Sequence, residues 1–167
     1  MTADMTIIEG LKKLKMIIRR MDKNNENISK YSAQWDNQRL YFGDEALQRA
    51  EIRKLIQSNN DLMLQYVELK TRIERTNLNT VVDIGGYALP IASWLIVLRK
   101  TGIKMLESYR SMNTDHAGRR VLGDKDSKLI RFYTEEDKNK GLRKWDDLLH
   151  GEIEGRLEVV NATTKLL

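Results

Sequence analysis

The chain has 167 residues, of which 41% are hydrophobic and 32% are charged, with one proline, no cysteine and a formal net charge of +5. These totals allow one domain with a real core and a wide solvated surface, and they favour long helices over a turn-rich sheet. The lack of cysteine excludes disulfides, thiolate zinc sites and cysteine nucleophiles, and it fits a cytoplasmic location.

Neither a membrane span nor a signal peptide is expected. The most apolar run, Tyr87 to Leu98, would be about 18 Å long as a helix, which is well short of a bilayer core. The opening residues lack the continuous apolar stretch of a signal peptide. The basic residues are spread in pairs along the chain, each diluted by nearby acids, a pattern that favours a solvated helical surface over a nucleic-acid-binding stripe.

The first predicted helix runs from Thr6 to about Ile28. Apolar residues recur in it at steps of three and four, which places them on one face. They are Ile7, Leu11, Leu14, Ile18 and Met21. The segment after this helix contains Arg-Leu-Tyr-Phe (39–42), which we expect to be extended. Asp44 then has the position of a cap for the next helix.

The second predicted helix carries the most regular pattern in the chain. Seven of its residues step by three and four in alternation, which is the heptad pattern of a coiled coil. They are Ile52, Leu55, Asn59, Leu62, Tyr66, Leu69 and Ile73. Asn59 either fixes the register and the number of partners of this seam or only edges the seam and reaches water. We expect the helix to fray from Thr76 to Asn79, where helix propensity falls.

The second half repeats this order of elements. Asp83 to Gly86 is predicted to be a turn, and Pro90 should lie in the opening turn of the third helix. Gly102 interrupts that helix, either as a weak point or as a place where another helix approaches closely. Residues 128–133 are a second extended candidate. Thr134, three residues before Asp137, has the spacing of a cap for a fourth helix. The apolar faces of these two helices comprise Ile91, Leu95, Leu98, Met105, Leu106, Tyr109 and Met112, and Leu142, Trp145, Leu149, Ile153, Leu157 and Val160.

One phrase is written twice, at Arg72–Thr80 and again half a chain later at Arg156–Thr164. The shift that carries the first copy onto the second also aligns Ile7 with Ile91 and many other apolar positions. We infer two copies of one unit, about 1–82 and 83–167, within a single helical domain of residues 1–167. The predicted fold is all-α, with four long helices as two pseudo-duplicated hairpins packed as a four-helix bundle. The two extended segments between the helices could pair as a short two-stranded β-ribbon.

The sequence resembles the septicolysin family of small helical bacterial proteins. Arg72–Thr80 is similar to that family's Ile-x-Arg-Thr-Asn-x-x-Thr segment, and Asp83–Ala92 to the Asp-x-Gly and Ala-Leu helix start that follows it. The closing Glu152–Leu166 resembles the family's terminal motif, although Ala162 replaces a usual tryptophan and Ile96-Val97 replaces a usual Arg-Asp pair. The resemblance implies an all-helical fold and no defined activity.

No catalytic constellation, cofactor motif or metal site is expected. Asp146, His150 and Glu154 share a helix face at steps of four, which is acceptable for metal ligands, but a solvated face with local ion pairs outweighs that reading. A glycine-rich phosphate-binding loop is missing from the sequence.

The polar ends of the second and fourth helices are the candidate ligand site. Their guanidinium, hydroxyl and amide groups could bind an anionic small molecule such as a nucleotide. The candidates are Arg72, Arg75, Thr76, Asn77, Asn79, Thr80, Asn161, Thr163 and Thr164. The alternative is helix termination, since Asn and Thr compete for backbone hydrogen bonds and arginine favours the negative end of a helix.

The leading functional hypothesis is a non-enzymatic, homo-oligomeric helical protein of interaction or scaffold type. The surfaces expected to join the subunits are the heptad seam and the apolar third helix. The candidate interface residues are Leu55, Asn59, Leu62, Tyr66, Leu69, Trp94 and Leu95. The first alternative is a protein that binds or sequesters an anionic small molecule. The second is an accessory protein that binds nucleic acid.

Overall fold

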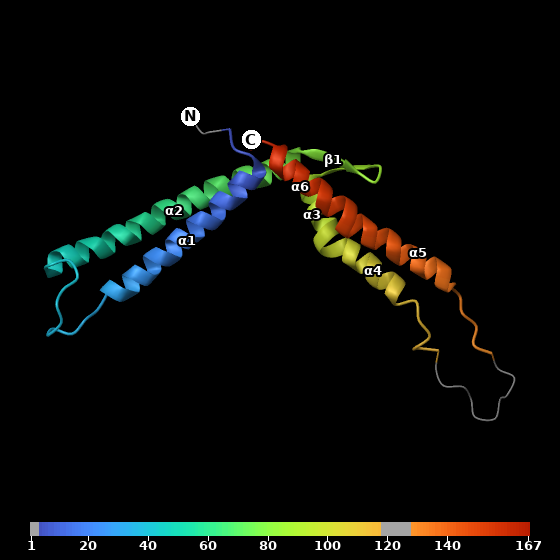
Figure 1. The fold of residues 1–167 in the computed structure, drawn as a ribbon, viewed down its shortest axis with the longest axis horizontal. Coiled ribbons are helices and arrows are strands. Elements are labelled where there is room, and N and C mark those ends of the chain that lie inside the picture. The colour runs from blue at the N-terminus through green and yellow to red at the C-terminus, as the bar shows by residue number, and fades with distance from the viewer. Residues whose placement is uncertain (1–3, 118–127) are drawn as a thin grey trace, which may run out of the picture. The chain divides into compact units, whose positions relative to one another are not determined.

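The structure is a computed structural model that describes residues 4–117 and 128–167. The described chain is mostly helical, with one small two-stranded antiparallel sheet, which confirms the predicted all-α class (Figure 1). It divides into two compact units. Unit 1 comprises Met1–Asn77 with Asn161–Leu167, and unit 2 comprises Leu78–Val160. Each unit holds one helical hairpin, as the duplication predicts.

Helix α1 (Ile7–Tyr31) begins unit 1 with a reciprocal cap. The Glu9 amide donates to the Thr6 hydroxyl oxygen, 3.4 Å away, and the Thr6 amide donates to the Glu9 carboxylate at 2.8 Å. These bonds satisfy two donors that the first turn would otherwise leave unpaired. The bond from the Thr6 backbone is the main reason why the pKa of Glu9 lies below its ordinary value.

Helix α2 (Glu45–Asn79) begins where the sequence predicts, because the Leu47 amide donates to the Asp44 side chain at 2.8 Å. The predicted fraying from Thr76 is wrong, since the helix continues through Asn79. Thr76 is fully buried, and its hydroxyl donates to the Arg72 carbonyl oxygen one turn earlier. Packing therefore overrides the low helix propensity of this stretch.

Helices α1 and α2 lie side by side as an antiparallel pair (Figure 1). The Asn24 side-chain amide donates to the Asn59 side-chain oxygen at 2.9 Å. Near the other end of the pair, a side chain at Gly10 would lie 3.1 Å from Ile73. In an antiparallel pair, the numbers of two opposite residues add up to the same value along the whole pair. Asn24 with Asn59 and Gly10 with Ile73 give equal sums, so the register is the same at both points.

The face of α1 that packs on α2 differs from the predicted one. Its buried members are Ile7, Gly10, Leu14 and Ile17. Leu11 and Ile18, which the spacing predicts on this face, are 37% and 43% exposed. Gly10 occupies a seam position of the heptad because a glycine allows close contact with α2. A search for apolar residues alone does not reveal this position, since glycine has no apolar side chain.

Unit 2 begins with a hairpin of β1 (Val81–Ile84) and β2 (Tyr87–Pro90), in which Val81 pairs with Pro90. Gly85 and Gly86, with φ of +60° and +81°, form the two-residue turn that joins the strands. This ribbon replaces the predicted one: residues 39–42 and 128–133, all described, form no strand. Those two segments belong to different units, whereas the glycine turn holds β1 and β2 next to each other in sequence.

The remaining helices of unit 2 form its hairpin, and each contains a π-helical turn. The first comprises α3 (Ile91–Ile96), η1 (Val97–Thr101) and α4 (Gly102–Arg110). The second comprises α5 (Glu135–Asp146), η2 (Asp147–Ile153) and α6 (Glu154–Thr163), and the Asp137 amide donates to Thr134 as predicted. Because a π turn takes in an extra residue, Leu149, Ile153 and Leu157 stay on one buried face at steps of four.

Gly102 marks a place where the two helices of unit 2 approach closely, one of the two readings that the sequence allows. A side chain there would lie 2.4 Å from Leu149 and 2.8 Å from the Val97 carbonyl oxygen. Leu149 belongs to the other helix and shows the close approach, whereas the Val97 carbonyl belongs to the π turn of the same helix and, as backbone, cannot move aside as a side-chain tip can. The glycine therefore serves packing and is not a weak point of the helix.

We predict that Gly102→Ala lowers the free energy of unfolding by about 1–2 kcal/mol. Overpacking of about 1–3 kcal/mol outweighs the gain of about 1 kcal/mol in helix propensity. Gly155→Ala is the matched control, because nothing lies within 4 Å of a side chain there, and it should stabilise the protein slightly. Denaturant unfolding followed by far-UV circular dichroism measures both changes. Equal stability of the two variants would contradict the close approach.

Candidate functional site

The duplicated phrase ends in a backbone acceptor in both of its copies. The Ile7 amide donates to the Thr164 carbonyl oxygen at 3.0 Å, and the Ile91 amide donates to the Thr80 carbonyl oxygen at 2.9 Å. The shift that relates the two copies of the phrase also relates the two donors and the two acceptors. Each threonine carbonyl thus satisfies the first amide of a helix, which that helix cannot satisfy itself. The repeat of the phrase therefore coincides with a repeat of this backbone contact.

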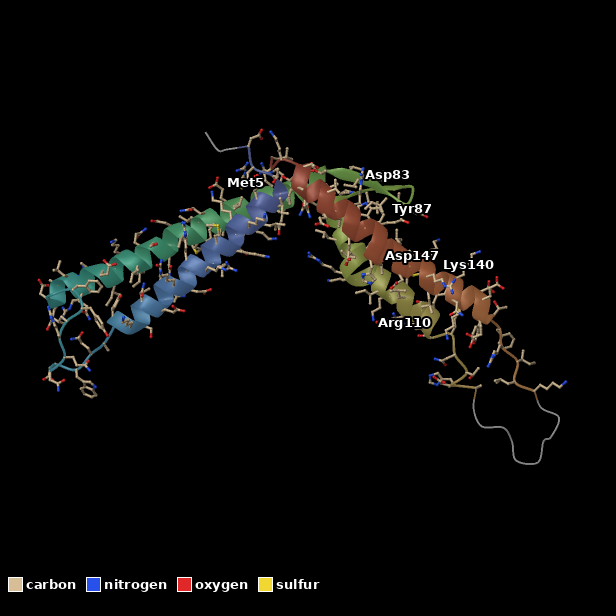
Figure 2. The ribbon with its side chains drawn as sticks, in the orientation of Figure 1. Met5, Asp83, Tyr87, Arg110, Lys140 and Asp147 are labelled. Atoms are coloured by element: carbon tan, nitrogen blue, oxygen red, sulfur yellow. The ribbon has the colours of Figure 1, made fainter. Side chains whose placement is uncertain are left out.

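A short antiparallel ladder accompanies each of these bonds. Thr6 pairs with Lys165 in unit 1, and Pro90 pairs with Val81 at the corresponding positions of unit 2. The Leu166 amide donates to the carbonyl oxygen of Met5, which lies just ahead of α1 (Figure 2). We call Asn161–Leu167 the closing segment, because it completes unit 1 as β1 completes unit 2.

Two of the predicted ligand-binding residues hold the closing segment. The Arg72 guanidinium donates to the Leu167 carbonyl oxygen at 3.0 Å and to that of Leu166 at 3.5 Å. The Leu167 amide in turn donates to the Thr76 hydroxyl oxygen at 3.0 Å. Arg72 and Thr76 are therefore engaged in the fold, and their side chains have partners without a ligand.

The nine predicted ligand-binding residues do not form one cluster within a unit. Asn79 and Thr80 belong to unit 2, and the other seven belong to unit 1. Arg75, Asn79 and Thr163 are exposed and each interacts within the molecule, while Asn161 and Thr164 are half-buried. The side-chain oxygen of Asn77 is buried and has no hydrogen-bond partner among the described residues. These placements favour helix termination and segment docking as the role of the set.

The predicted subunit-interface residues have partners within their own chain. Leu55, Asn59, Leu62, Tyr66 and Leu69 belong to the buried or half-buried seam of α2, and Asn59 also donates to the Asn25 side chain at 2.9 Å. Trp94 is buried, and its indole donates to the Val82 carbonyl oxygen at 2.9 Å, while Leu95 is half-buried. Packing within one chain accounts for the burial of these residues, and their part in a contact between chains stays a prediction.

One flank of the α1–α2 hairpin is apolar and open to solvent. Its members follow directly after the seam positions Gly10, Ile17, Leu55 and Leu62, and such positions lie on the same side of an antiparallel pair. We define the apolar flank as Leu11, Ile18, Ile56, Met63 and Val67, the last one turn beyond Met63; these residues are 37–56% exposed. Lys15, one turn beyond Leu11, and Lys70, one heptad beyond Met63, lie on the same side. Exposed apolar residues gathered on one side of a helix pair mark contacts with partners more often than residues scattered singly.

The opposite flank of the same hairpin is basic. A groove of about 320 Å³ lies there, lined by Glu9, Lys12, Lys13, Met16, Ile17, Arg20 and Gln65. Five cationic side chains on this flank or on the outer surface of α1 form no ion pair with another described residue: Lys12, Lys13, Arg19, Arg20 and Lys23. The charge that looks diluted along the sequence is therefore gathered on the outer surface of one helix.

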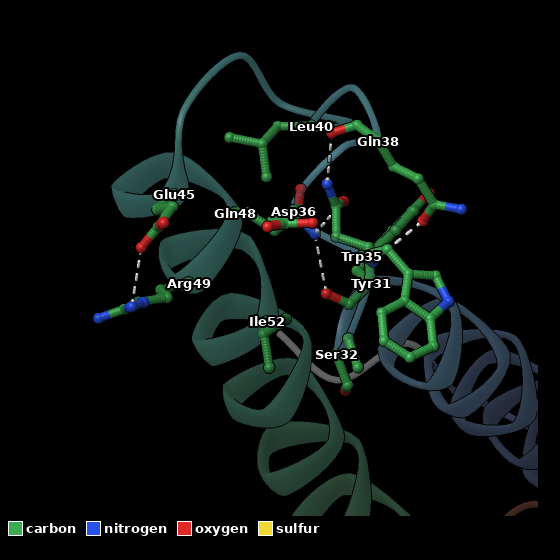
Figure 3. Close-up of a pocket in the computed structure, with 12 residues that line it drawn as sticks. Tyr31, Ser32, Trp35, Asp36, Gln38, Leu40, Glu45, Gln48, Arg49 and Ile52 are labelled. Carbon is green, nitrogen blue, oxygen red and sulfur yellow. Dashed lines mark hydrogen bonds and ion pairs between the residues drawn. The ribbon is translucent and has the colours of Figure 1, made fainter.

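A third feature lies at the loop that joins α1 to α2, where side chains surround a hollow of about 600 Å³ (Figure 3). Gln48, which is buried, organises this loop. Its side-chain amide donates to the Tyr31 carbonyl oxygen at 3.0 Å, and its side-chain oxygen accepts from the Tyr41 amide at 3.1 Å. Trp35 stands at the hollow with 76% of its surface exposed. Nothing in the sequence pattern points to Gln48, because its role depends on a loop conformation.

Chemistry at a metal ion finds no support in the described residues. His150 lies 4.0 Å from Asp146 and 3.4 Å from Glu154, and all three side chains are exposed, as ordinary pairs on a helix surface are. Within residues 4–117 and 128–167, no three His, Cys, Asp or Glu side chains are grouped to hold a metal ion. Every helix in those ranges is too short or too polar to cross a lipid bilayer.

Comparison with known proteins identifies no relative: no family model, curated protein or solved structure matches the chain. The resemblance to the septicolysin family therefore stays a prediction from the motifs described above. The function is argued below from the surfaces of the molecule.

We predict that Leu166→Ala lowers the free energy of unfolding by about 2–4 kcal/mol, because its side chain fills the space beside Gly10 and Ile73. The neighbouring residue Leu167 provides the control, because its side chain is 58% exposed whereas that of Leu166 is 9% exposed. Leu167→Ala keeps its backbone bonds and should change stability by less than about 0.5 kcal/mol. Urea denaturation curves compare the two, and equal losses would show that the closing segment is not docked as described.

Proposed function

We propose that the protein is a non-enzymatic helical interaction protein that associates with itself through the apolar flank of the α1–α2 hairpin. The observation that carries the proposal is the exposure of five apolar side chains on one side of this two-helix pair. A two-helix pair buries only one seam, so the flank of one copy is free to face the flank of another. Two hairpins joined in this way form a four-helix bundle.

A second copy is the proposed partner because the apolar flank of one molecule can pack against the identical flank of another. An interface with twofold symmetry brings the same patch of both subunits together, and apolar side chains satisfy that requirement without matching charges. The seam is not needed for this contact, since α1 already covers it. Association then buries apolar surface at about 25 cal/mol per Å², from which the cost of joining two molecules is subtracted. The cytoplasmic location expected from the sequence is part of this proposal.

We predict that Met63→Glu weakens self-association at least about tenfold, because two carboxylates would be placed within an apolar contact. Leu64→Glu is the matched control: its neighbour in sequence is also apolar and more exposed, at 63%, but points away from the flank. Sedimentation velocity across a concentration series measures both. A strict monomer at tens of micromolar for the unaltered protein would overturn the proposal, as would equal effects of the two substitutions.

Nucleic-acid binding is the second candidate function, and the basic flank supports it. Its cationic side chains lie on the outer surface of α1 and form no close ion pair with a described residue, although Lys12 also attracts the Glu9 carboxylate of the same groove. Phosphate groups of a nucleic-acid backbone would pair with them and release counterions. The binding of a small anion at the Arg, Thr and Asn helix ends has less support, because Arg72 and Thr76 already hold the closing segment.

We predict that Lys13→Gln with Arg20→Gln lowers the retention of the protein on heparin and its affinity for DNA or RNA. If both side chains contact phosphates, the slope of log K against log salt should fall by about 1–2. Arg53→Gln with Arg110→Gln removes the same charge from exposed positions elsewhere and serves as the control. Gel shifts at several salt concentrations give the slopes. The nucleic-acid hypothesis fails if the unaltered protein gives no salt-dependent shift.

A further inference from the structure

Each unit is completed by a segment that follows the second helix of the other unit. Residues 78–84, which include β1, follow the body of α2 but belong to unit 2, and the closing segment follows the body of α6 but belongs to unit 1. The two exchanged segments make the same backbone contacts, since the Thr164 and Thr80 carbonyl oxygens each accept from the first amide of a helix. The chain therefore has the connectivity of two hairpins that have exchanged their last strands.

The site in unit 1 that receives the closing segment has features that recognise an extended strand. Main-chain bonds join Met5 to Leu166 and Ile7 to Thr164, which fixes the register. Gly10 provides space for an apolar side chain, because a side chain at Gly10 would lie 3.0 Å from Leu166. Specificity for the strand comes from this small space, and affinity comes from the backbone bonds.

Charged and polar groups then secure the end of the segment. Arg72 donates to the carbonyl oxygens of its last two residues, Thr76 accepts from the Leu167 amide, and Lys165 forms an ion pair with Asp4. None of these contacts depends on the segment belonging to the same molecule. Any chain that presents Thr164 to Leu167 in extended form would make the same set.

The two exchanged segments differ in how they are tied to their sites. Gly85 and Gly86 connect β1 directly to β2, so β1 cannot leave its partner strand without opening a two-residue turn. The chain between Met5 and Leu166 instead runs through all of unit 2. The closing segment can therefore leave its site while both hairpins remain folded, and a site left empty exposes Gly10 and Ile73.

We propose that the closing segment of one copy docks in unit 1 of a second copy, so that the chain associates by exchange of this strand. The proposal names the contact that joins the copies and rests on the self-association proposed above, but it does not need the apolar flank. The closing segment makes the same contacts whether it docks in its own chain or in another. The ratio of closed monomer to exchanged assembly therefore depends on the effective concentration of the segment within one chain compared with the protein concentration. Exchange between chains should therefore increase with protein concentration.

Disulfide trapping tests this directly, because the chain contains no cysteine. Thr6→Cys and Lys165→Cys are made in separate copies, since these residues pair in the ladder of unit 1. The copies are mixed, unfolded, refolded together and oxidised, and the products are resolved without reductant. The expected result is a disulfide-linked heterodimer of the two variants that exceeds either homodimer about tenfold and declines on dilution. If circular dichroism shows that removal of the Thr6 cap impairs folding, Asp4→Cys and Leu167→Cys, the next positions on the same face in the register that Thr6 and Lys165 set, replace the first pair.

The matched control uses the corresponding positions of unit 2. Val81→Cys and Pro90→Cys, again in separate copies, pair in a ladder that the glycine turn closes within one chain. No excess heterodimer is expected from this mixture. An equal yield from both mixtures would show random collision and would overturn the exchange.

The outcomes separate this inference from the proposed function. If the unaltered protein self-associates in sedimentation but the first mixture gives no heterodimer, the exchange is overturned and the flank contact stands. If the heterodimer forms equally well when both copies also carry Met63→Glu, the exchange holds without the flank. A chain carrying both Thr6→Cys and Lys165→Cys that closes only on itself at every concentration would again overturn the exchange.

Discussion

The fold depends on two backbone hydrogen bonds, from Ile7 to Thr164 and from Ile91 to Thr80. Each bond satisfies the exposed first amide of a helix with a carbonyl oxygen from the chain that leaves the other hairpin. One shift along the sequence relates both donors and both acceptors, so the two copies of the phrase end at the same backbone contact. Among the residues that look like a ligand site in sequence, Arg72 and Thr76 hold the segment that makes one of these contacts.

The α1–α2 hairpin presents different chemistry on each of its sides. The seam lies between α1 and α2 and is covered within the hairpin. The bond between Asn24 and Asn59 fixes its register, because neither helix can slide by a heptad without separating these two side-chain amides. One flank then offers apolar side chains and the other offers cations without ionic partners among the described residues. These two surfaces are the basis of the proposed self-association and of the second candidate function, because apolar and cationic side chains favour partners of different chemistry.

The helices could be predicted well from the sequence because periodicity and capping are local signals. The caps at Asp44 and Thr134 follow from residues close together in the chain, and the duplication follows from comparing two stretches of sequence without any knowledge of the fold. The seam of α1 is harder to predict because Gly10 contributes a contact surface without an apolar side chain. The glycine pair at Gly85 and Gly86, flanked by Val-Val-Asp-Ile and Tyr-Ala-Leu, is a recognisable hairpin signal that goes beyond the turn predicted there.

The apolar and basic flanks are harder to predict, because they depend on which side of a helix its partner helix leaves uncovered. Periodicity assigns Leu11 and Ile18 to the core, yet α2 leaves them exposed on the apolar flank. The roles of Arg72 and Thr76 could not be predicted from local sequence either, since their partners lie at the far end of the chain. The ladder of Thr6 and Lys165 could have been predicted in one way. The shift between the two copies of the phrase carries Val81 onto Lys165 and Thr6 onto Pro90, so a hairpin at Val81 and Pro90 implies a matching pair in unit 1.

The docking of the closing segment has a consequence for synthesis on the ribosome. Helices α1 and α2 emerge before unit 2, but the strand partner of Met5 is Leu166, so unit 1 cannot be finished until unit 2 has also been made. Unit 2, whose ladder is closed by a two-residue turn, can be complete before then. The space beside Gly10 therefore stays unfilled on the nascent α1–α2 hairpin, and under the proposed exchange the first strand to fill it decides whether a molecule matures alone or joined to a neighbour on the same messenger.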